Sequence, residues 1–303
     1  MFGNVFVGVD GSPTGRDAIA LAAALAGPGA RVTLAHVQVG LGASDFMFYA
    51  TTLGFGAPAN EDSQQLLETE RETAGVDAEL IGFTASSVAR GLHTLAEEHR
   101  ADLLVLGSCS RGLVGRILVG DDTRASLNGA PCAIAIAPRG YAARPAGFAA
   151  IGVGYDFSGE SQSALAAARE LAARYGSKLR VLDVVSPPVG AYSSPMLGNW
   201  GEMLEAQRKA ADERLESIPG ADGTAVYGVA GEELAAAGDR VDLLVVGSRS
   251  YGPMRRLVFG STSSYLVSHA RCPLLVLPRS APTGSQTSAE ERAQTQAPVG
   301  ASS

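Results

Sequence analysis

The chain repeats itself once, at a spacing of about 140 residues. The segment ADLLVLGSCSRGLVGRILVGDDTRASLNGAPCAIAIAPR, residues 101–139, has nearly the same layout as VDLLVVGSRSYGPMRRLVFGSTSSYLVSHARCPLLVLPR, residues 241–279. Residues 5–26 likewise resemble residues 149–172, and residues 32–37 resemble residues 179–184. Because the segments follow the same order in both halves, we interpret the chain as a tandem duplication of one domain-sized unit.

Within each half, short apolar runs alternate with helical stretches. Continuous apolar runs are typical of strands that are covered on both faces. Ser12 followed by Pro13 predicts the start of a helix, Ser158 has the same role in the second half, and Gly176 predicts that helix's end. Residues 86–100 and 232–238 predict a later helix in each half, the former before a strand at 103–106.

This alternation predicts an α/β protein made of two tandem Rossmann-like or flavodoxin-like domains. Each would contain a five-stranded, mostly parallel sheet with helices on both faces. Such sheets bind ligands beyond the carboxyl ends of their strands, where the strand order reverses.

The domain boundaries follow from the repeat. We expect one domain at residues 1–140 and a second at 147–280, joined by a linker at 139–147. Residues 281–303 are rich in Ser, Thr, Gln, Ala and Pro, which predicts a disordered tail. Residues 40–66 and 186–202 are less periodic and predict mobile loops after the second strand of each half.

Composition narrows the functional class. The 303 residues are 46% hydrophobic and carry a net charge of −7, and only Lys178 and Lys209 are lysines. This balance argues against a nucleic-acid partner. The three cysteines, Cys109, Cys132 and Cys272, are odd in number and far apart, as expected of free thiols in a reducing cytoplasm. We expect no signal peptide and no membrane partner, since a strand-like run begins almost at once and no apolar stretch is long enough to span a bilayer.

At these residues the chain resembles the universal stress proteins, a family of the adenine nucleotide alpha hydrolase-like fold. The family's nucleotide signature is Gly, two residues, Gly, nine residues, Gly, then Ser or Thr. The second half has Gly247, Ser250, Gly260 and Ser261 at this spacing. The first half has Gly107, Ser110, Gly120 and Asp121. Serine thus replaces the second glycine in both halves, and Asp121 replaces the final hydroxyl in the first.

The resemblance implies a site in each half for ATP or another adenine nucleotide, with Mg²⁺ as an accompanying ion. It places Asp10 and Asp156 near the adenine, Val37 and Val184 beside the base, and Gly8 and Gly154 in a turn beneath the nucleotide. The candidate binding residues are Gly154, Tyr155, Asp156, Val184, Val246, Gly247, Arg249, Ser250, Gly260, Ser261, Thr262 and Ser263 in the second half and Gly8, Val9, Asp10, Val37, Gly107, Ser110, Gly120 and Thr123 in the first.

Physical chemistry fits this signature. A glycine at a strand end leaves room for a phosphate, and a helix that starts at Gly260 presents free amides to an anion. Hydroxyls at Ser261 and Ser263 can donate to phosphate oxygens. Plainer roles remain open: the glycines as strand-exit turns, the aspartates as turn or capping residues, and the valines as core.

The halves are not equivalent at the phosphate end. A carboxylate at Asp121 would repel a phosphate by about 4 kcal/mol per pair of unit charges near a surface. A bridging divalent cation or Arg111 would offset this repulsion, and Thr123 still offers a hydroxyl. We therefore expect the second half to bind a nucleotide better than the first.

Three functions follow as hypotheses. The first is a regulatory module that binds an adenine nucleotide with little turnover. The second is a nucleotide-independent interaction protein with a degenerate pocket. The third is a slow ATP hydrolase in which Asp121 or Asp122 acts as the base, although the chain lacks a Gly-x-x-x-x-Gly-Lys loop and a nucleophile elbow. The resemblance also implies a pseudo-twofold pair in which strands 133–137 and 274–277 meet, and a homodimer through the edges of these last strands.

Overall fold

The computed structural model describes residues 1–40, 61–109, 117, 121–143, 147–186, 200–248 and 257–278, without the side chains of residues 121–123 and 200. The predicted tail at 281–303 lies outside these ranges. The first half contains strands β1 (Phe2–Gly8), β2 (Ala26–Val39), β3 (Glu79–Ala85), β4 (Leu103–Gly107) and β5 (Ala133–Ala137). The second contains β6 (Ala150–Gly154), β7 (Lys178–Val185), β8 (Asp222–Tyr227), β9 (Leu243–Gly247) and β10 (Leu274–Leu277).

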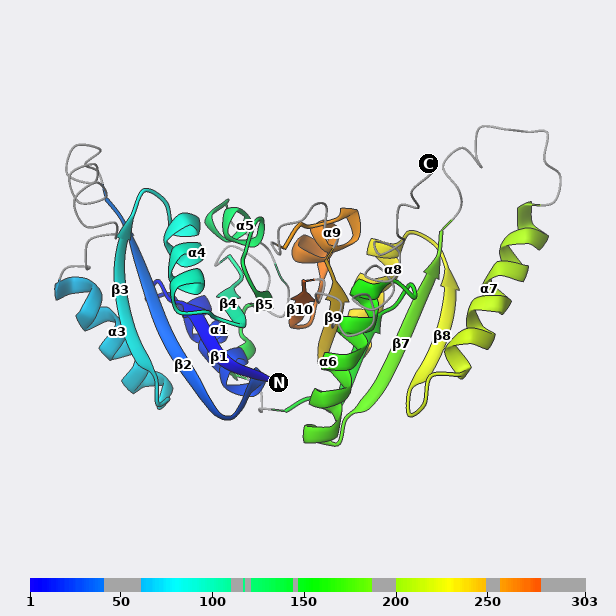
Figure 1. Cartoon of the computed structure of the whole chain (residues 1–303), viewed down its shortest axis with the longest axis horizontal. Helices are drawn as coiled ribbons and strands as arrows, with labels where there is room; N and C mark the ends of the chain where they lie inside the picture. The colour runs from blue at the N-terminus through cyan, green and yellow to red at the C-terminus, as the bar shows by residue number, and fades with distance from the viewer. Residues whose placement is uncertain are drawn as a thin grey trace, which may run out of the picture.

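All ten strands join into one sheet with the order β3-β2-β1-β4-β5-β10-β9-β6-β7-β8 (Figure 1). Each half thus has the order third, second, first, fourth, fifth, and its neighbours pair in parallel. This order is Rossmann-like, whereas a flavodoxin-like sheet would place the first strand between the second and third. The predicted pair of mostly parallel α/β domains is confirmed.

The two halves meet through β5 and β10, which pair antiparallel with Leu274 opposite Ile136 and Val276 opposite Ile134. The expected contact between the last strands is therefore present within the chain. It also corrects the expected homodimer through these edges, because β5 lies between β4 and β10, and β10 lies between β5 and β9. Neither last strand retains an unpaired edge, and the outermost strands of the described sheet are β3 and β8.

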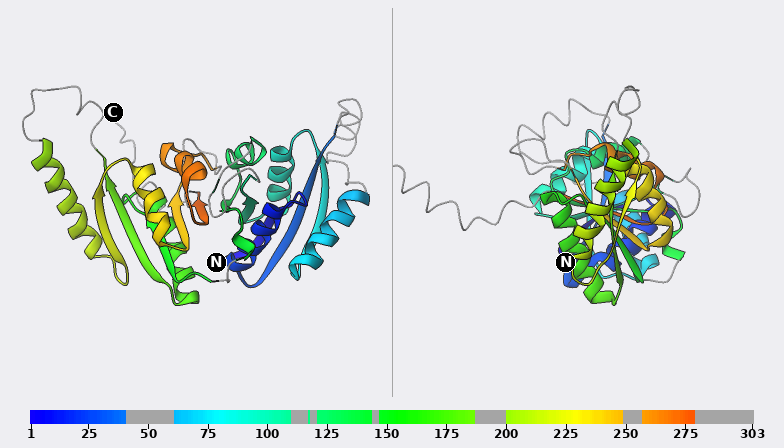
Figure 2. Two further views of the ribbon diagram at one scale, coloured as in Figure 1. Left: turned by 180° about the vertical axis from the view of Figure 1, so that it is seen from behind. Right: turned by 90° about the vertical axis from the view of Figure 1, so that its right-hand side faces the viewer.

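Helices cover both faces of the sheet. The helices α1 (Pro13–Leu25), α3 (Glu61–Ala74), α6 (Gly159–Tyr175) and α7 (Trp200–Glu216) contribute to one core. The helices α4 (Val88–Glu98), α8 (Ala230–Ala237) and α9 (Ser261–His269), together with α5 (Asp121–Leu127), contribute to the other. Figure 2 shows α3 and α7 at the two outer ends of the molecule. None of the described helices is long and apolar enough to cross a bilayer.

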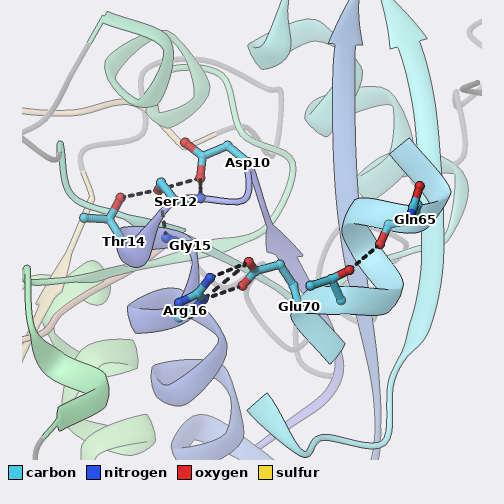
Figure 3. Close-up of polar contacts among 8 residues, drawn as sticks. Asp10, Ser12, Thr14, Gly15, Arg16, Gln65 and Glu70 are labelled. Carbon is cyan, nitrogen blue, oxygen red and sulfur yellow. Dashed lines mark hydrogen bonds and ion pairs between the residues drawn. The ribbon is translucent and has the colours of Figure 1, made fainter. Parts of the chain in front are cut away.

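Local signals place the helix ends where the sequence predicts them. The side chains of Ser12 and Ser158 accept hydrogen bonds from the backbone N–H groups of Gly15 and Ser161. Gly176 ends α6 in the left-handed conformation, with φ of 66°. Figure 3 shows the start of α1, together with the ion pair between Arg16 and Glu70 that ties α1 to α3.

Two expected loops are shorter than predicted. Residues 61–66 and 200–202 are helical, because α3 begins at Glu61 and α7 begins at Trp200. Acidic residues occupy the first turn of both helices, where they interact favourably with the helix dipole. The remainder of both loops lies outside the described residues, apart from Gly40 and Ser186 at their starts.

Reciprocal backbone bonds connect the halves beyond the sheet. The N–H of Ile117 donates to Ala270 O at 2.9 Å, and the N–H of Leu257 donates to Ala130 O at 2.8 Å. Ile117 and Leu257 precede α5 and α9, whereas Ala130 and Ala270 follow these helices in the opposite half. Both apolar side chains are buried. Each half therefore anchors the segment that leads into the other half's last helix.

The junction predicts a large stability cost for Leu275→Ala. Leu275 is fully buried in β10, opposite Ala135 of β5. We expect the free energy of unfolding to fall by about 2–5 kcal/mol, as for other buried Leu→Ala changes. Val229→Ala, at a position that is 56% exposed, should stay within about 0.5 kcal/mol of the parent. Urea titrations of both variants measure this, and equal effects would contradict the assigned core.

Candidate functional site

Each half contains a cavity at the same place in its fold. The cavity of the second half has a volume of about 330 Å³, and that of the first half about 290 Å³. Both lie at the carboxyl ends of the strands, beside Gly8 of β1 and Gly107 of β4 in one half and beside Gly154 of β6 and Gly247 of β9 in the other. These strand pairs are the points where the strand order reverses, the usual position of a ligand site in such sheets.

Most of the candidate residues line the two cavities. In the second half these are Gly154, Tyr155, Asp156, Val184, Val246, Gly247, Gly260, Thr262 and Ser263. In the first half they are Gly8, Val9, Asp10, Val37 and Gly107. Gly8 and Gly154 are the last residues of their strands rather than parts of a turn, which corrects that expectation. Ser261 is exposed and does not line the cavity.

Four candidates fall outside the described residues. They are Ser110 and Gly120 in the first half and Arg249 and Ser250 in the second. The same holds for Arg111, and for the side chains of Asp121, Asp122 and Thr123, although the backbone of these last three opens α5. The expected asymmetry between the halves and the hydrolase hypothesis both depend on Asp121 and remain predictions.

Asp10 and Asp156 hold the turns that open α1 and α6. Asp10 Oδ1 accepts from the N–H of Ser12 at 3.0 Å and from its hydroxyl at 2.6 Å (Figure 3). Asp156 Oδ1 accepts from the same groups of Ser158 at 3.1 and 2.5 Å. Burial raises the pKa of the Asp156 carboxyl, but hydrogen bonds from Ser158 and Ser161 outweigh burial and lower its pKa below the ordinary value. Both aspartates therefore have a turn-forming role while lining the cavity.

Gly107 and Gly247 are required by packing. A Cβ at Gly107 would lie 2.2 Å from the backbone oxygen of Thr14, and one at Gly247 would lie 2.7 Å from the backbone carbon of Glu160. Both neighbours belong to the first turn of α1 or α6. These glycines thus let the helix start approach the strand end, and room for a phosphate beside them remains a prediction.

The start of α9 forms one wall of the larger cavity. Gly260 is its N-cap residue, and the N–H of Gly260 donates to Ser263 Oγ at 3.0 Å. Ser263 Oγ in turn donates to Gly260 O at 3.4 Å, so this hydroxyl serves the helix start rather than a ligand. Thr262 lines the cavity beside the first-turn amides. A helix start of this kind attracts anions.

Two buried serines were missed by the sequence reasoning. Ser108 and Ser248 follow the strand-end glycines and line the two cavities, with only 2% and 1% of their surface exposed. Within the described part of the chain, neither Oγ atom has a hydrogen-bond partner. A buried hydroxyl without a partner costs about 1–3 kcal/mol. The repeated Gly-Ser pair was visible in the sequence, but the lack of a partner is a property of the packed structure.

The two cavities differ in charge. Asp183 of β7 lines the larger cavity at the position where β2 has His36, and Glu160 stands where α1 has Thr14. Asp156, Glu160 and Asp183 thus contribute three carboxylates to the second half, whereas Asp10 contributes one to the described lining of the first. In the described part of the chain, no three or more His, Cys, Asp and Glu side chains cluster closely enough to hold a metal ion.

Two residues at the second site are in energetically unfavourable environments: Asp183 is a buried acid, and Phe157 has a left-handed backbone. Burial raises the pKa of the Asp183 carboxyl, with Arg214 opposing and Asp156 adding to the rise. Phe157 adopts a left-handed backbone with φ of 62°, where the first half has Gly11 with φ of 75°. Its ring packs 4.8 Å from Tyr155 and lies 4.2 Å beneath the Arg214 guanidinium. These ring contacts hold a conformation that costs roughly 1–2 kcal/mol for a residue with a Cβ.

Other singled-out side chains have plain roles. His36 Nδ1 lies 2.8 Å from Val9 O at the edge of the smaller cavity. Cys109 is a half-buried free thiol that lines the same cavity. Cys132 and Cys272 are buried, and burial raises the pKa of both thiols to about 12, which makes them inert core residues.

The packing role of Gly247 can be tested by Gly247→Ala. Because the added methyl group meets the backbone of Glu160, we expect a loss of about 1–3 kcal/mol in the free energy of unfolding. Gly159→Ala is the matched control, since its Cβ would point into open space. Thermal and urea denaturation would compare the two variants. A neutral Gly247→Ala would show that α6 does not pack as closely as described.

Asp183→Asn should stabilise the protein in a pH-dependent way. The folded state raises the pKa of Asp183, so ionisation above that pKa favours the unfolded chain. The variant should therefore be more stable than the parent near pH 7. This gain should disappear below about pH 4, where the carboxyl is protonated in both states. Urea titrations across this range measure the difference, and a gain that persists in acid would contradict the titration of Asp183 as its source.

Comparison with known proteins identifies the family of this fold. The model of the universal stress protein family matches residues 1–138 and again residues 147–278. A universal stress protein of Mycobacterium tuberculosis is 30% identical over 208 residues, which cover 63% of this chain and 69% of that protein. The crystal structure of a universal stress protein from Archaeoglobus fulgidus superposes with a TM-score of 0.63 at 18% identity, covering 92% of this chain and 99% of that one. Another universal stress protein, solved in complex with cAMP, matches 44% of this chain and 99% of its own, with 22% identity and a TM-score of 0.30. The chain belongs to the universal stress protein family and contains two of its domains in tandem.

Proposed function

We propose that this protein binds an adenine nucleotide, ATP or a close relative, as a regulatory ligand. One observation carries the proposal: the chain builds the same cavity twice, at the strand-order reversal of each half. Each cavity combines an Asp-x-Ser turn, a strand-end glycine and a buried serine hydroxyl that has no partner. Two copies of such a constellation favour a ligand site over an accident of packing.

The residues of the larger cavity suit the two ends of a nucleotide. Phosphates would lie at the first turn of α9, near Gly260 and Thr262, where the free backbone amides of a helix start would face them. The nucleoside would lie at the end of β7, near Val184. A volume of about 330 Å³ falls within the range of small-molecule sites. The choice of adenine rests on the family spacing from Gly247 to Gly260.

The carboxylates at the larger cavity determine which ionic form of the nucleotide fits it. Three carboxylates at the larger cavity would repel a bare polyphosphate, so a nucleotide accompanied by Mg²⁺ suits this half better than the free anion. Among the described residues no cluster of His, Cys, Asp and Glu would hold the ion, and in this proposal Mg²⁺ arrives with the phosphates. Stronger binding in the second half remains part of this proposal, on the basis of Asp121 in the first.

Thr262→Asp should weaken nucleotide binding without harming the fold. An acidic residue in the first turn stabilises a helix, whereas its charge beside a phosphate is repulsive. We expect the affinity of the second half for Mg²⁺-ATP to fall at least about tenfold in calorimetric titrations. Ser264→Asp adds the same charge to α9 at an exposed position outside the cavity and serves as the control.

Equal affinities in these two variants would contradict the assigned phosphate end. Mass spectrometry of the small molecules released from the denatured, freshly purified protein is an independent readout of the same proposal. No released nucleotide, together with no heat on titration with any purine nucleotide, would favour the nucleotide-independent interaction protein instead.

A further inference from the structure

The second half carries an acidic side chain where the first half carries a histidine. Asp183 lies opposite Ala225 of β8 in the parallel register, just as His36 lies opposite Gly82 of β3. Both residues line the cavity of their half. The scaffold is thus the same, and the chemistry that faces a ligand is different.

Asp183 has no close counter-charge in the part of the chain that the structure describes. Its side chain is only 9% exposed, and no described Lys, Arg or His lies within the 4.0 Å of an ion pair. The guanidinium of Arg214, whose charge acts on Asp183, is engaged over the ring of Phe157. The carboxylate of Asp156 adds repulsion. The carboxylate accepts a backbone hydrogen bond from Val184, and its remaining acceptor positions lie at the edge of the cavity, where donors on a ligand can reach them.

A second feature of the same cavity also points to a ligand. The Ser248 hydroxyl is 1% exposed and has no hydrogen-bond partner. Asp183 and Ser248 come from the ends of different strands, β7 and β9. The cavity thus combines a carboxyl acceptor and an uncommitted hydroxyl, and both would gain from a polar ligand that bears hydroxyl groups.

The position of Asp183 identifies which part of the ligand it meets. In dinucleotide-binding α/β units of this strand order, an acidic residue at the end of the second strand accepts a hydrogen bond from the ribose 2′-hydroxyl of NAD. Asp183 lies at this place, two residues before the end of β7. His36, at the same place in the first half, presents an imidazole whose Nδ1 already contacts Val9 O.

We propose that Asp183 makes the second half selective for ribonucleotides by accepting a hydrogen bond from the ribose 2′-hydroxyl, and that the first half lacks this selection. The inference rests on the proposed nucleotide function. In this proposal the second half discriminates between ribose and 2′-deoxyribose, and the first half accepts both sugars.

The test compares ATP with 2′-deoxyATP by calorimetry on the full-length protein. In the parent, the second half should prefer ATP by roughly 10- to 100-fold, the range expected for a hydrogen bond to a charged group. Asp183→Asn should remove most of this preference, because it lowers the affinity for ATP and leaves the affinity for 2′-deoxyATP nearly unchanged. His36→Asp should create a preference in the first half. Glu213→Gln, at an exposed position on α7, is the control and should leave the ratio unchanged.

The outcomes separate the two proposals. If both nucleotides bind the parent equally, or if Asp183→Asn keeps the parent's ratio, the ribose role is wrong while nucleotide binding stands. If neither nucleotide binds the parent, the proposed function fails and the ribose role fails with it. Thermal denaturation confirms that each variant is folded before titration, and a stabilised Asp183→Asn with unchanged nucleotide selectivity would reduce Asp183 to a structural residue.

Discussion

The antiparallel pairing of β5 with β10 is the contact on which the rest of this architecture depends. Each half alone would end its sheet in a short strand of buried apolar residues, with an unpaired row of backbone groups. Such edges favour association with other chains. The pairing satisfies both edges at once and turns two five-stranded sheets into one ten-stranded sheet. It also explains why duplication within a single chain is sufficient for a contact that would otherwise require a second copy.

The same junction links the two sites to each other's surroundings. Ile117 is hydrogen-bonded to the residue that follows α9, and Leu257 is hydrogen-bonded to a residue that follows α5. The start of α9 lines the cavity of the second half at Gly260 and Thr262. Each half therefore hydrogen-bonds a residue that precedes the last helix of the other half.

The cavities arise from the packing of the fold, and energetically unfavourable groups lie around them. The absence of a side chain at Gly107 and Gly247 lets α1 and α6 start close to the strand ends, and the space above these strands is the cavity. Ser108 and Ser248 are left with buried hydroxyls, and Asp183 with a buried charge. Strain at Phe157 adds to these costs in the second half only. Unfavourable features that gather around one cavity are typical of a binding site, because a ligand can offset them. The side chains that line the two cavities thus differ in charge, although the backbones of the two halves are alike.

The sequence by itself determined the features that depend on neighbouring residues or on comparison of the two halves. These are the duplication, the alternation of strands and helices, the helix starts at Ser12 and Ser158, and the helix end at Gly176. The candidate residues were found because the spacing of Gly247 and Gly260 can be compared with a known family signature. The strand order, the closeness of Thr14 to Gly107, the missing partners of Ser108 and Ser248, and the position of Asp183 beside Asp156 were decided only by the tertiary structure. Each of these features depends on segments that are far apart in the chain, and packing rather than local preference sets the distance between such segments.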